Sequence, residues 1–363
     1  MRIFTGIFAL LFALYLVGCS GANDTDADVQ ATVIGIGHIP TLVIEGDGTF
    51  LNIYSSRHFV ADEEIFRKFT EATGIGINVI QASSGQFVER LRIEGANTSA
   101  DLIIAADGGI LSNAKNRGLL QPVYSDILHN NVPSCLRDAD NYFYAMSFRA
   151  RIIAFANDND LPISVANYDD LASNALNGRI LLRPGNHLYN ISLLASLIDI
   201  YGYDTAFRWA QDVNNNRARN PQGNDRDQIR AISAGVGDIA LINSYYLGLM
   251  LHSPDNEEIR AAENISIVFP NQSTTGTHIN ISGVAVPRYS SNVDAAIRFM
   301  EFVTSAQIQQ FIADTNFEYP ANPLAYPPDF LLDYGDFSKQ DINFDALYEY
   351  HIQAVEILNI VGW

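Results

Sequence analysis

Short apolar runs alternate with helical segments of roughly 10 to 15 residues along most of this chain. In its first part the apolar runs fall at 50–54, 77–81 and 101–106, and the helical patterns at 61–74, 85–95 and 109–118. Strands that alternate with helices of this length build crossover units, in which a helix covers the sheet between two parallel strands. The pattern therefore predicts an α/β fold with a mostly parallel sheet.

The same alternation begins again in the second part of the chain. Its expected elements are strands at 148–157, 179–184, 238–243, 265–270 and 283–287, and helices at 189–202, 225–235 and 293–315. A chain of 363 residues, of which 48% are hydrophobic, exceeds the size of one ordinary core. The sequence therefore predicts two domains.

The beginning of the chain is typical of a secreted lipoprotein. Residues 1–19 combine a positive charge at Arg2 with an apolar run that is too short to span a membrane, which favours a signal peptide. Leu16 to Cys19 fit the lipobox, so we expect a lipid on Cys19 and an extracytoplasmic, membrane-anchored protein; the alternative is an ordinary signal peptide with a chance cysteine. Residues 20–48 are expected to form an acidic tether, apolar enough at 31–44 to add a strand.

Composition excludes several classes of function. The formal net charge of −19 argues against a nucleic-acid partner. This acidity suits either attraction of a cation or solubility of the whole surface. The two cysteines, Cys19 and Cys135, cannot build a zinc site of the multi-cysteine kind. No phosphate-binding loop, nucleophile elbow or metalloprotease motif occurs, so we do not expect an enzyme.

Two adjacent tyrosines, Tyr245 and Tyr246, directly follow the apolar run at 238–243. Phenolate is a hard, anionic oxygen donor, and hard donors suit hard, highly charged cations such as ferric iron. In a chain with 17 tyrosines, such a pair is also compatible with simple packing. His58 and Tyr189 likewise follow expected strands, and open α/β sheets bind ligands at the carboxyl ends of their strands. These side chains are therefore candidates for one site, although packing explains each of them separately.

Several stretches resemble the ferric-iron-binding periplasmic proteins of ABC transporters, particularly their cyanobacterial-type branch. In order, they are LNIYSSRHF (51–59), NVPSCLRD (131–138), FRARIIAF (148–155), YNISLLASL (189–197), NPQGND (220–225), NSYYLG (243–248), FPNQSTTGTHINISG (269–283) and AAIRFMEFVTS (295–305). The resemblance extends over roughly 300 residues in family order, which makes it more specific than any single motif.

The resemblance implies a set of metal ligands. Its iron-binding positions fall on His58, Tyr189, Tyr245 and Tyr246. Phe59 stands where the family usually has a further tyrosine, so one ligand is missing. Three phenolates would neutralise a ferric ion, and His58 would add a neutral donor.

Two arginines are candidates for holding a helper anion. Arg149 and Arg151 carry forked donors that suit carbonate, and a structural ion pair is the alternative explanation for each of them.

The resemblance also implies the architecture, a two-lobed type II periplasmic binding fold with a hinge and an interlobe cleft. One lobe is expected to comprise 49–147 and 278–330, the other 148–277, with a helical region at 331–363 that packs across both lobes. The expected function is capture of ferric iron in the cleft by a monomer and delivery to an inner-membrane ABC permease, without catalysis. A rival hypothesis keeps this fold but places an organic or oxyanion ligand between the tyrosines of a carrier or sensor, and Phe59 favours it.

Overall fold

The computed structural model describes residues 41–57 and 60–363. Its strands are β1 (Thr41–Ile44), β2 (Phe50–Ser55), β3 (Gly76–Gln81), β4 (Leu102–Ala105), β5 (Leu120–Gln121), β6 (Phe143–Ala156), β7 (Ile180–Leu181), β8 (Ile239–Asn243), β9 (Ile265–Val268) and β10 (Ile279–Pro287). The signal peptide, Cys19 and most of the acidic tether lie outside the described residues, as do His58 and Phe59. β1 forms the last four residues of the apolar stretch 31–44.

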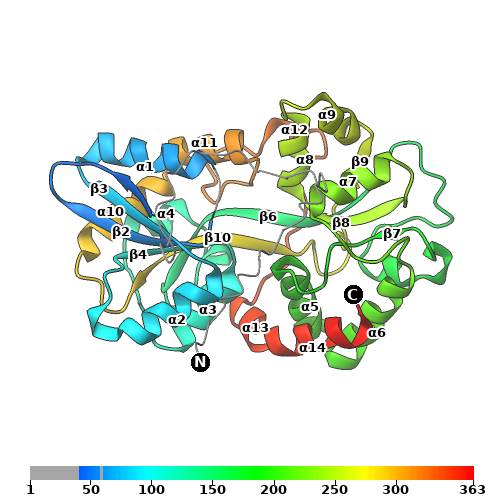
Figure 1. Ribbon diagram of the computed structural model, residues 1–363, viewed down its shortest axis with the longest axis horizontal. Helices are drawn as coiled ribbons and strands as arrows, with labels where there is room; N and C mark the ends of the chain where they lie inside the picture. Colours follow the sequence, from blue (N-terminus) through cyan, green and yellow to red (C-terminus); the bar gives the residue numbers. More distant parts are fainter. Residues whose placement is uncertain (1–40, 58–59) are drawn as a thin grey trace, which may run out of the picture. The chain divides into compact units, whose positions relative to one another are not determined.

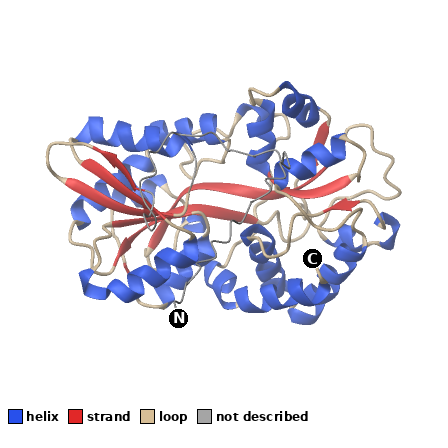
Figure 2. Ribbon diagram, in the orientation of Figure 1, coloured by secondary structure: helices blue, strands red, loops and turns tan. Residues whose placement is uncertain are grey.

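Helices flank these strands on both faces, as Figure 2 shows. They are α1 (Val60–Thr73), α2 (Ser84–Glu94), α3 (Gly108–Asn116), α4 (Asp126–Asn131), α5 (Leu188–Tyr201), α6 (Tyr203–Asn215), α7 (Asp225–Ser233), α8 (Ser244–Leu251), α9 (Asn256–Glu263), α10 (Val293–Val303), α11 (Ala306–Asn316), α12 (Asp329–Leu332), α13 (Phe344–Glu349) and α14 (His351–Val361). Short 3-10 turns occur at Gly95–Asn97, Ser134–Leu136, Asp169–Ala172 and Asn174–Leu176. Among the described residues, no helix is both long enough and apolar enough to cross a membrane.

The strands form one sheet in the order β1-β3-β2-β4-β10-β6-β8-β7, with β5 paired to β10 and β9 paired to β6. The pairs β2–β3, β2–β4 and β7–β8 are parallel, as the crossover pattern predicts. The pairs that β6 and β10 form with each other and with their neighbours are antiparallel, as is the edge pair β1–β3, so the expectation of a mostly parallel sheet was wrong. The alternation of strand and helix does not reveal strands that return without a crossover helix.

The long strands β6 and β10 join two groups of elements. Figure 1 shows them side by side between β2, β3 and β4 at one end and β7, β8 and β9 at the other. Their pairing shifts register between Ser282 and Gly283. A Cβ added to Gly283 would lie 2.6 Å from Leu111 Cδ1 and 3.1 Å from the Tyr144 carbonyl oxygen, so glycine is required for this close approach.

The single helix expected at 293–315 is two helices, α10 and α11, separated at Thr304 and Ser305. The Asn322 side chain donates to the Thr304 carbonyl (Nδ2–O 2.8 Å), and the Gln309 side chain donates to the Val303 carbonyl (Nε2–O 2.7 Å). Both carbonyls would accept backbone N–H groups in a continuous helix. The expectation of one helix was therefore wrong because distant side chains take over these acceptors, a long-range effect that hydrophobic periodicity does not record.

The last helices pack against elements of both groups. α13 contacts α3 and α5, and α14 contacts α5 and α6. A Cβ on Gly108 would lie 2.4 Å from the Phe344 ring, so α13 approaches the start of α3 closely. One cluster of buried apolar side chains is continuous from Leu51 on β2 to Leu358 on α14. The segment that carries α13 and α14 is thus part of the main core.

Candidate functional site

Two tyrosines from different helices bring their hydroxyl groups together. Tyr189 is the second residue of α5 and Tyr245 the second residue of α8, and their hydroxyl oxygens are 2.8 Å apart. The Tyr246 ring stacks on the Tyr245 ring with a centroid distance of 4.3 Å. α8 begins directly after β8, so the strand delivers this pair to the carboxyl end of the sheet. The first turn of a helix favours negative charge, which suits the phenolate forms of these residues.

Burial keeps the tyrosine pair protonated in the absence of a metal. Burial raises the pKa of Tyr245 well above 10, and the neighbouring Tyr189 and Tyr246 raise it further. The pKa of Tyr246 is also raised, first by burial and then by Tyr189 and Asp225. Each phenolate formed next to another costs more than the last unless a cation is present. A nearby cation would therefore favour ionisation of these two phenols.

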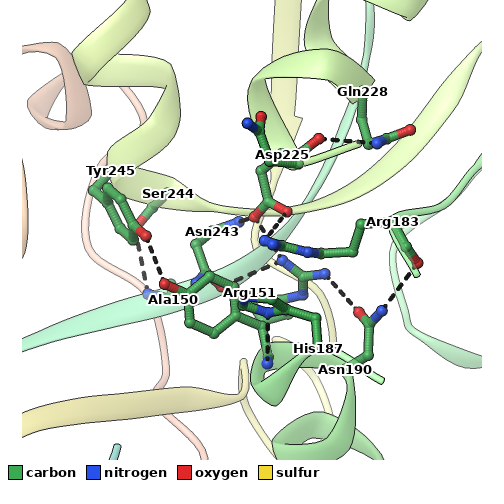
Figure 3. A network of polar contacts seen from close by, with 12 residues as sticks. Ala150, Arg151, Arg183, His187, Asn190, Asp225, Gln228, Asn243, Ser244 and Tyr245 are labelled. Atoms are coloured by element: carbon green, nitrogen blue, oxygen red, sulfur yellow. Dashed lines mark hydrogen bonds and ion pairs between the residues drawn. The ribbon is translucent and has the colours of Figure 1, made fainter. Parts of the chain in front are cut away.

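A buried carboxylate, Asp225, organises the arginines around the tyrosines (Figure 3). It accepts from Arg151 Nη1 (2.8 Å), from Arg183 Nη1 (2.7 Å) and from the backbone N–H of Asn243 (2.8 Å). Although burial raises its pKa, Arg151 and Arg183 lower it more, so the pKa of Asp225 lies below its usual range. Asp225 therefore connects the end of β8, which precedes the tyrosine pair, to the segment that precedes Tyr189.

Two guanidinium groups flank the Tyr189 ring. Arg183 lies 5.0 Å and Arg149 5.3 Å from its centroid. Both guanidinium groups therefore make cation–π contacts with this ring. The His187 ring meets the Tyr189 ring edge-on at 4.4 Å, and its Nδ1 accepts the Tyr189 backbone N–H (3.3 Å), which caps α5. Burial, followed by the charge of Arg183, lowers the pKa of His187 to about 3, so this imidazole is neutral at physiological pH.

A small cavity adjoins Tyr189 on the side of β6 and β10. The centre of a water-sized sphere can occupy about 10 Å³ of this cavity. The cavity therefore has room for about one water molecule. Its lining comprises Arg149, Arg151, Tyr189, Ser192, Asn243, His278 and Asn280.

The side chains that line this cavity include several donors without an acceptor. Arg149 Nη2, Arg151 Nε and Asn243 Nδ2 are buried and have no hydrogen-bond partner within the described residues. Ser192 Oγ already accepts from Asn280 Nδ2 (2.6 Å) and contacts His278 Nε2 (3.3 Å). The cavity is therefore rich in donors and suits an oxygen atom that carries negative charge.

The structure brings some of the candidate site residues together and leaves others outside the described residues. Tyr189, Tyr245 and Tyr246 lie together, whereas His58 and Phe59 fall outside the described residues. The charged fork of Arg151 binds Asp225 and the Asn190 amide, as the ion-pair alternative proposed. Arg149 lines the cavity, and its Nη2 lies 3.9 Å from Asp107 without a hydrogen bond among the described residues.

Sequence reasoning missed Arg183, His187 and Asp225. A signal existed for Asp225, because it closes the stretch NPQGND that the resemblance includes. Within the described ranges, no group of three or more His, Cys, Asp or Glu side chains could hold a metal.

The comparisons with known proteins agree with this geometry. A family model described as "Bacterial extracellular solute-binding protein" matches residues 64–339. The chain is 39% identical over 320 residues to "Iron uptake protein A1" of Synechocystis, which corresponds to 88% of each protein.

Two solved structures are similar over most of this chain. The ferric binding protein from Campylobacter jejuni has a TM-score of 0.81 and 42% identity, over 86% of this chain and 99% of that chain. A Trichodesmium protein in complex with iron and citrate ligands has a TM-score of 0.81 and 37% identity, again over 86% of this chain and 99% of that one. These similarities confirm the resemblance and the α/β, two-lobed type II periplasmic binding fold that it implies.

Proposed function

Because this chain belongs to the bacterial extracellular solute-binding proteins, we propose that it captures ferric iron outside the cytoplasm for delivery to an ABC permease in the inner membrane. The names of its relatives, which refer to iron uptake and ferric binding, support iron over the rival organic or oxyanion ligand. They describe binding and transport proteins, in agreement with a role that requires no catalysis.

The observation that carries this proposal is the 2.8 Å approach of the Tyr189 and Tyr245 hydroxyls beside the stacked Tyr246 ring. Three phenols that lose their protons supply three negative charges, which balance one ferric ion. A divalent ion would leave a net negative charge in a buried place. The donor set therefore favours a trivalent, hard cation. Binding must release protons, because the ligands are protonated beforehand.

His58 is proposed as a further, neutral ligand from the opposite lobe. We divide the chain into one lobe of 49–147 with 278–330 and another of 148–277, and the strands β6 and β10 that join the two groups of elements support this division. A ligand favours closure only through higher affinity for the closed state, and a metal bound by both lobes has that property. The absence of a hydroxyl at Phe59 leaves one coordination position for water or an anion.

A helper anion such as carbonate is proposed to fill that position. Arg149 supports it, because this buried guanidinium lines the cavity and its Nη2 makes no hydrogen bond among the described residues. The cavity has room for about one oxygen atom, so it would receive one end of the anion rather than the whole of carbonate. The relative solved with iron and citrate ligands supports an anion beside the metal.

We further propose that Cys19 carries the lipid that attaches this monomer to the membrane. The lipobox from Leu16 to Cys19 supports this location. Cys19→Ala should release the protein from membranes or block its maturation, and mass spectrometry of the wild-type protein should detect the acyl chains. A wild-type protein that is fully soluble and carries no lipid would refute the anchor but not iron binding.

Ferric phenolate absorbs visible light by charge transfer, so the iron-free protein should turn orange to red with ferric citrate. Tyr245→Phe/Tyr246→Phe should abolish this colour with the fold intact, because only two hydroxyls are removed. The matched control is Tyr201→Phe/Tyr203→Phe, which removes two hydroxyls at the junction of α5 and α6 and should keep the colour. Unchanged colour and affinity in the Tyr245→Phe/Tyr246→Phe protein would overturn the iron assignment.

A further inference from the structure

Trp363 forms hydrogen bonds with the segment that leads to Tyr189. Its indole N–H donates to the Arg183 carbonyl (3.1 Å), and its own carbonyl accepts the Gly185 N–H (3.1 Å). Two hydrogen bonds of opposite direction thus join one residue to both ends of the short segment Arg183–Gly185. This segment follows β7 and lies only a few residues before the tyrosine that opens α5.

The contact between Gly185 and Trp363 leaves no space for a side chain at position 185. A Cβ added to Gly185 would lie 2.5 Å from the Trp363 carbonyl oxygen, below any ordinary contact distance. Gly362 ends α14 with a left-handed φ of 73°, which turns the chain so that the Trp363 N–H donates to the Leu358 carbonyl (3.1 Å). The Trp363 ring packs at 5.8 Å from the Trp209 ring. Trp363 is therefore fixed from its own helix and from α6.

The segment Arg183–Gly185, which Trp363 binds, carries the groups that surround the tyrosines. Arg183 donates to Asp225 (2.7 Å) and lies 5.0 Å from the centre of the Tyr189 ring. The Arg183 carbonyl, which accepts the indole N–H, also accepts from Asn190 Nδ2 (3.2 Å). Asn190 is the neighbour of Tyr189, and its Oδ1 accepts from Arg151 (2.8 Å). One carbonyl thus receives both the Trp363 indole and the side chain next to the proposed metal ligand.

We propose that Trp363 is a positioning residue for the ferric site: it holds the Arg183–Gly185 segment so that Arg183 and Tyr189 keep the geometry in which Tyr189 meets Tyr245. This inference rests on the proposed function, because its effect is read through iron. Trp363 acts through the segment and touches neither the hydroxyl groups nor the metal. A displaced segment would separate the Tyr189 and Tyr245 oxygens, and metal sites tolerate only small errors in ligand position.

Trp363→Phe tests the indole bond by itself. Phenylalanine keeps an aromatic ring beside Trp209 and the carbonyl that accepts the Gly185 N–H, and it removes the indole donor together with part of the ring. Loss of one such bond should accelerate iron release to a citrate competitor roughly three- to tenfold. The charge-transfer band should shift, because the donor geometry at iron changes. The control is Ile360→Ala on the same helix, whose side chain is 60% exposed and should leave both readouts at their wild-type values.

A double-mutant cycle tests the contact between Gly185 and the Trp363 carbonyl. Gly185→Ala in the full chain should accelerate iron release more than Trp363→Phe does, because the new methyl group meets the Trp363 carbonyl. In a chain that ends at Gly362 this carbonyl is absent, so the added cost of Gly185→Ala should largely disappear. Such non-additivity is the mark of two residues in direct contact. Fully additive effects would overturn the inference.

The readouts separate a positioning role from simple stabilisation. Thermal unfolding of the iron-free variants measures stability, and a merely structural role would lower the midpoint while the band and the release rate of the folded protein stay unchanged. That result for Trp363→Phe would overturn the inference. If the shortened chain does not fold, Trp363→Phe and Ile360→Ala decide the question. A wild-type protein that binds no ferric iron would refute the proposed function, whereas normal wild-type binding with unaffected Trp363 variants refutes only the role of Trp363.

Discussion

One buried arginine, Arg57, and a group of three buried arginines beside the tyrosines lie at different places in this fold. Carboxylates neutralise their charges to different degrees. In the Arg57 cluster, Arg57 binds both Asp62 oxygens (3.1 and 3.1 Å) and also Glu318 (3.0 Å). In the tyrosine site, Arg151 and Arg183 share the single carboxylate of Asp225, and Arg149 lies 3.9 Å from Asp107. Among the described residues, two carboxylates thus bind the one arginine of the Arg57 cluster. In the tyrosine site, two carboxylates serve three arginines.

The difference separates a structural cluster from a binding site. The Arg57 cluster ties the end of β2 to the start of α1 and to the residue Glu318 after α11, and its acceptors are used within the protein. The tyrosine site keeps an excess of positive charge and buried donors without partners. Such groups are costly unless a ligand completes them. Because three phenolates are balanced by the ferric ion itself, a helper anion beside the iron would supply the missing negative charge.

The largest effect should come from Arg57→Met. Removing this guanidinium leaves the buried Asp62 and Glu318 carboxylates without their cation, which should cost about 3–5 kcal/mol in the free energy of unfolding. Denaturant unfolding measures it. The control Arg92→Met, at a side chain that is 56% exposed, should change stability by no more than about 0.5 kcal/mol. A loss below about 1 kcal/mol in Arg57→Met would break the contrast between the two arginine groups.

A second effect, which develops only in acid, should come from His278→Gln. Burial, with the charges of Arg149 and Arg151 adding to it, lowers the pKa of His278 from 6.5 to about 3. The unfolded chain takes up this proton below pH 6.5 while the folded chain resists it, so stability falls as pH decreases from about 6.5 to about 3. The slope contributed by this group is at most about 1.4 kcal/mol per pH unit. Stability curves against pH should be flatter for His278→Gln, and parallel curves would show that His278 does not resist protonation.

The smallest effect on stability should come from Arg149→Met. Arg149 Nη2 makes no hydrogen bond among the described residues and lies 3.9 Å from Asp107, which still accepts from the Asn280 side chain (2.6 Å) and the Gly109 N–H (2.7 Å) after the change. The free energy of unfolding should change by no more than about 1 kcal/mol, while iron retention against citrate should weaken because the cation that favours the anion is gone. A large loss of stability with unchanged iron retention would assign Arg149 to the structural class of Arg57.

Part of this arrangement could be predicted from the sequence. The alternation of strands and helices located β2, β3, β4 and β8, and the rule that ligands sit at strand ends correctly grouped Tyr189 with Tyr245 and Tyr246. These inferences depend on local periodicity and on one topological rule, both of which a sequence records.

Other features could not be predicted because they arise from contacts between distant residues. Asp225 meets Arg151 and Arg183 across 74 and 42 positions of sequence, and the Trp363 indole meets the Arg183 carbonyl across 180. The break between α10 and α11 depends in the same way on Asn322, which follows α11. No periodic pattern identifies such partners, and the residues that support the site were therefore found only in the folded chain.

The central claim is that three neutral phenols become phenolates when a trivalent ion binds. Ionised tyrosine has a distinct ultraviolet absorbance, so difference spectra during titration of the iron-free protein with Ga³⁺, which lacks the visible bands of ferric iron, would count the tyrosines that ionise. Alkaline titration of the unfolded protein calibrates the change per tyrosine. About three tyrosines should ionise per bound ion, with a large reduction in Tyr245→Phe/Tyr246→Phe. Binding without tyrosine ionisation, or with the same amplitude in that variant, would contradict it.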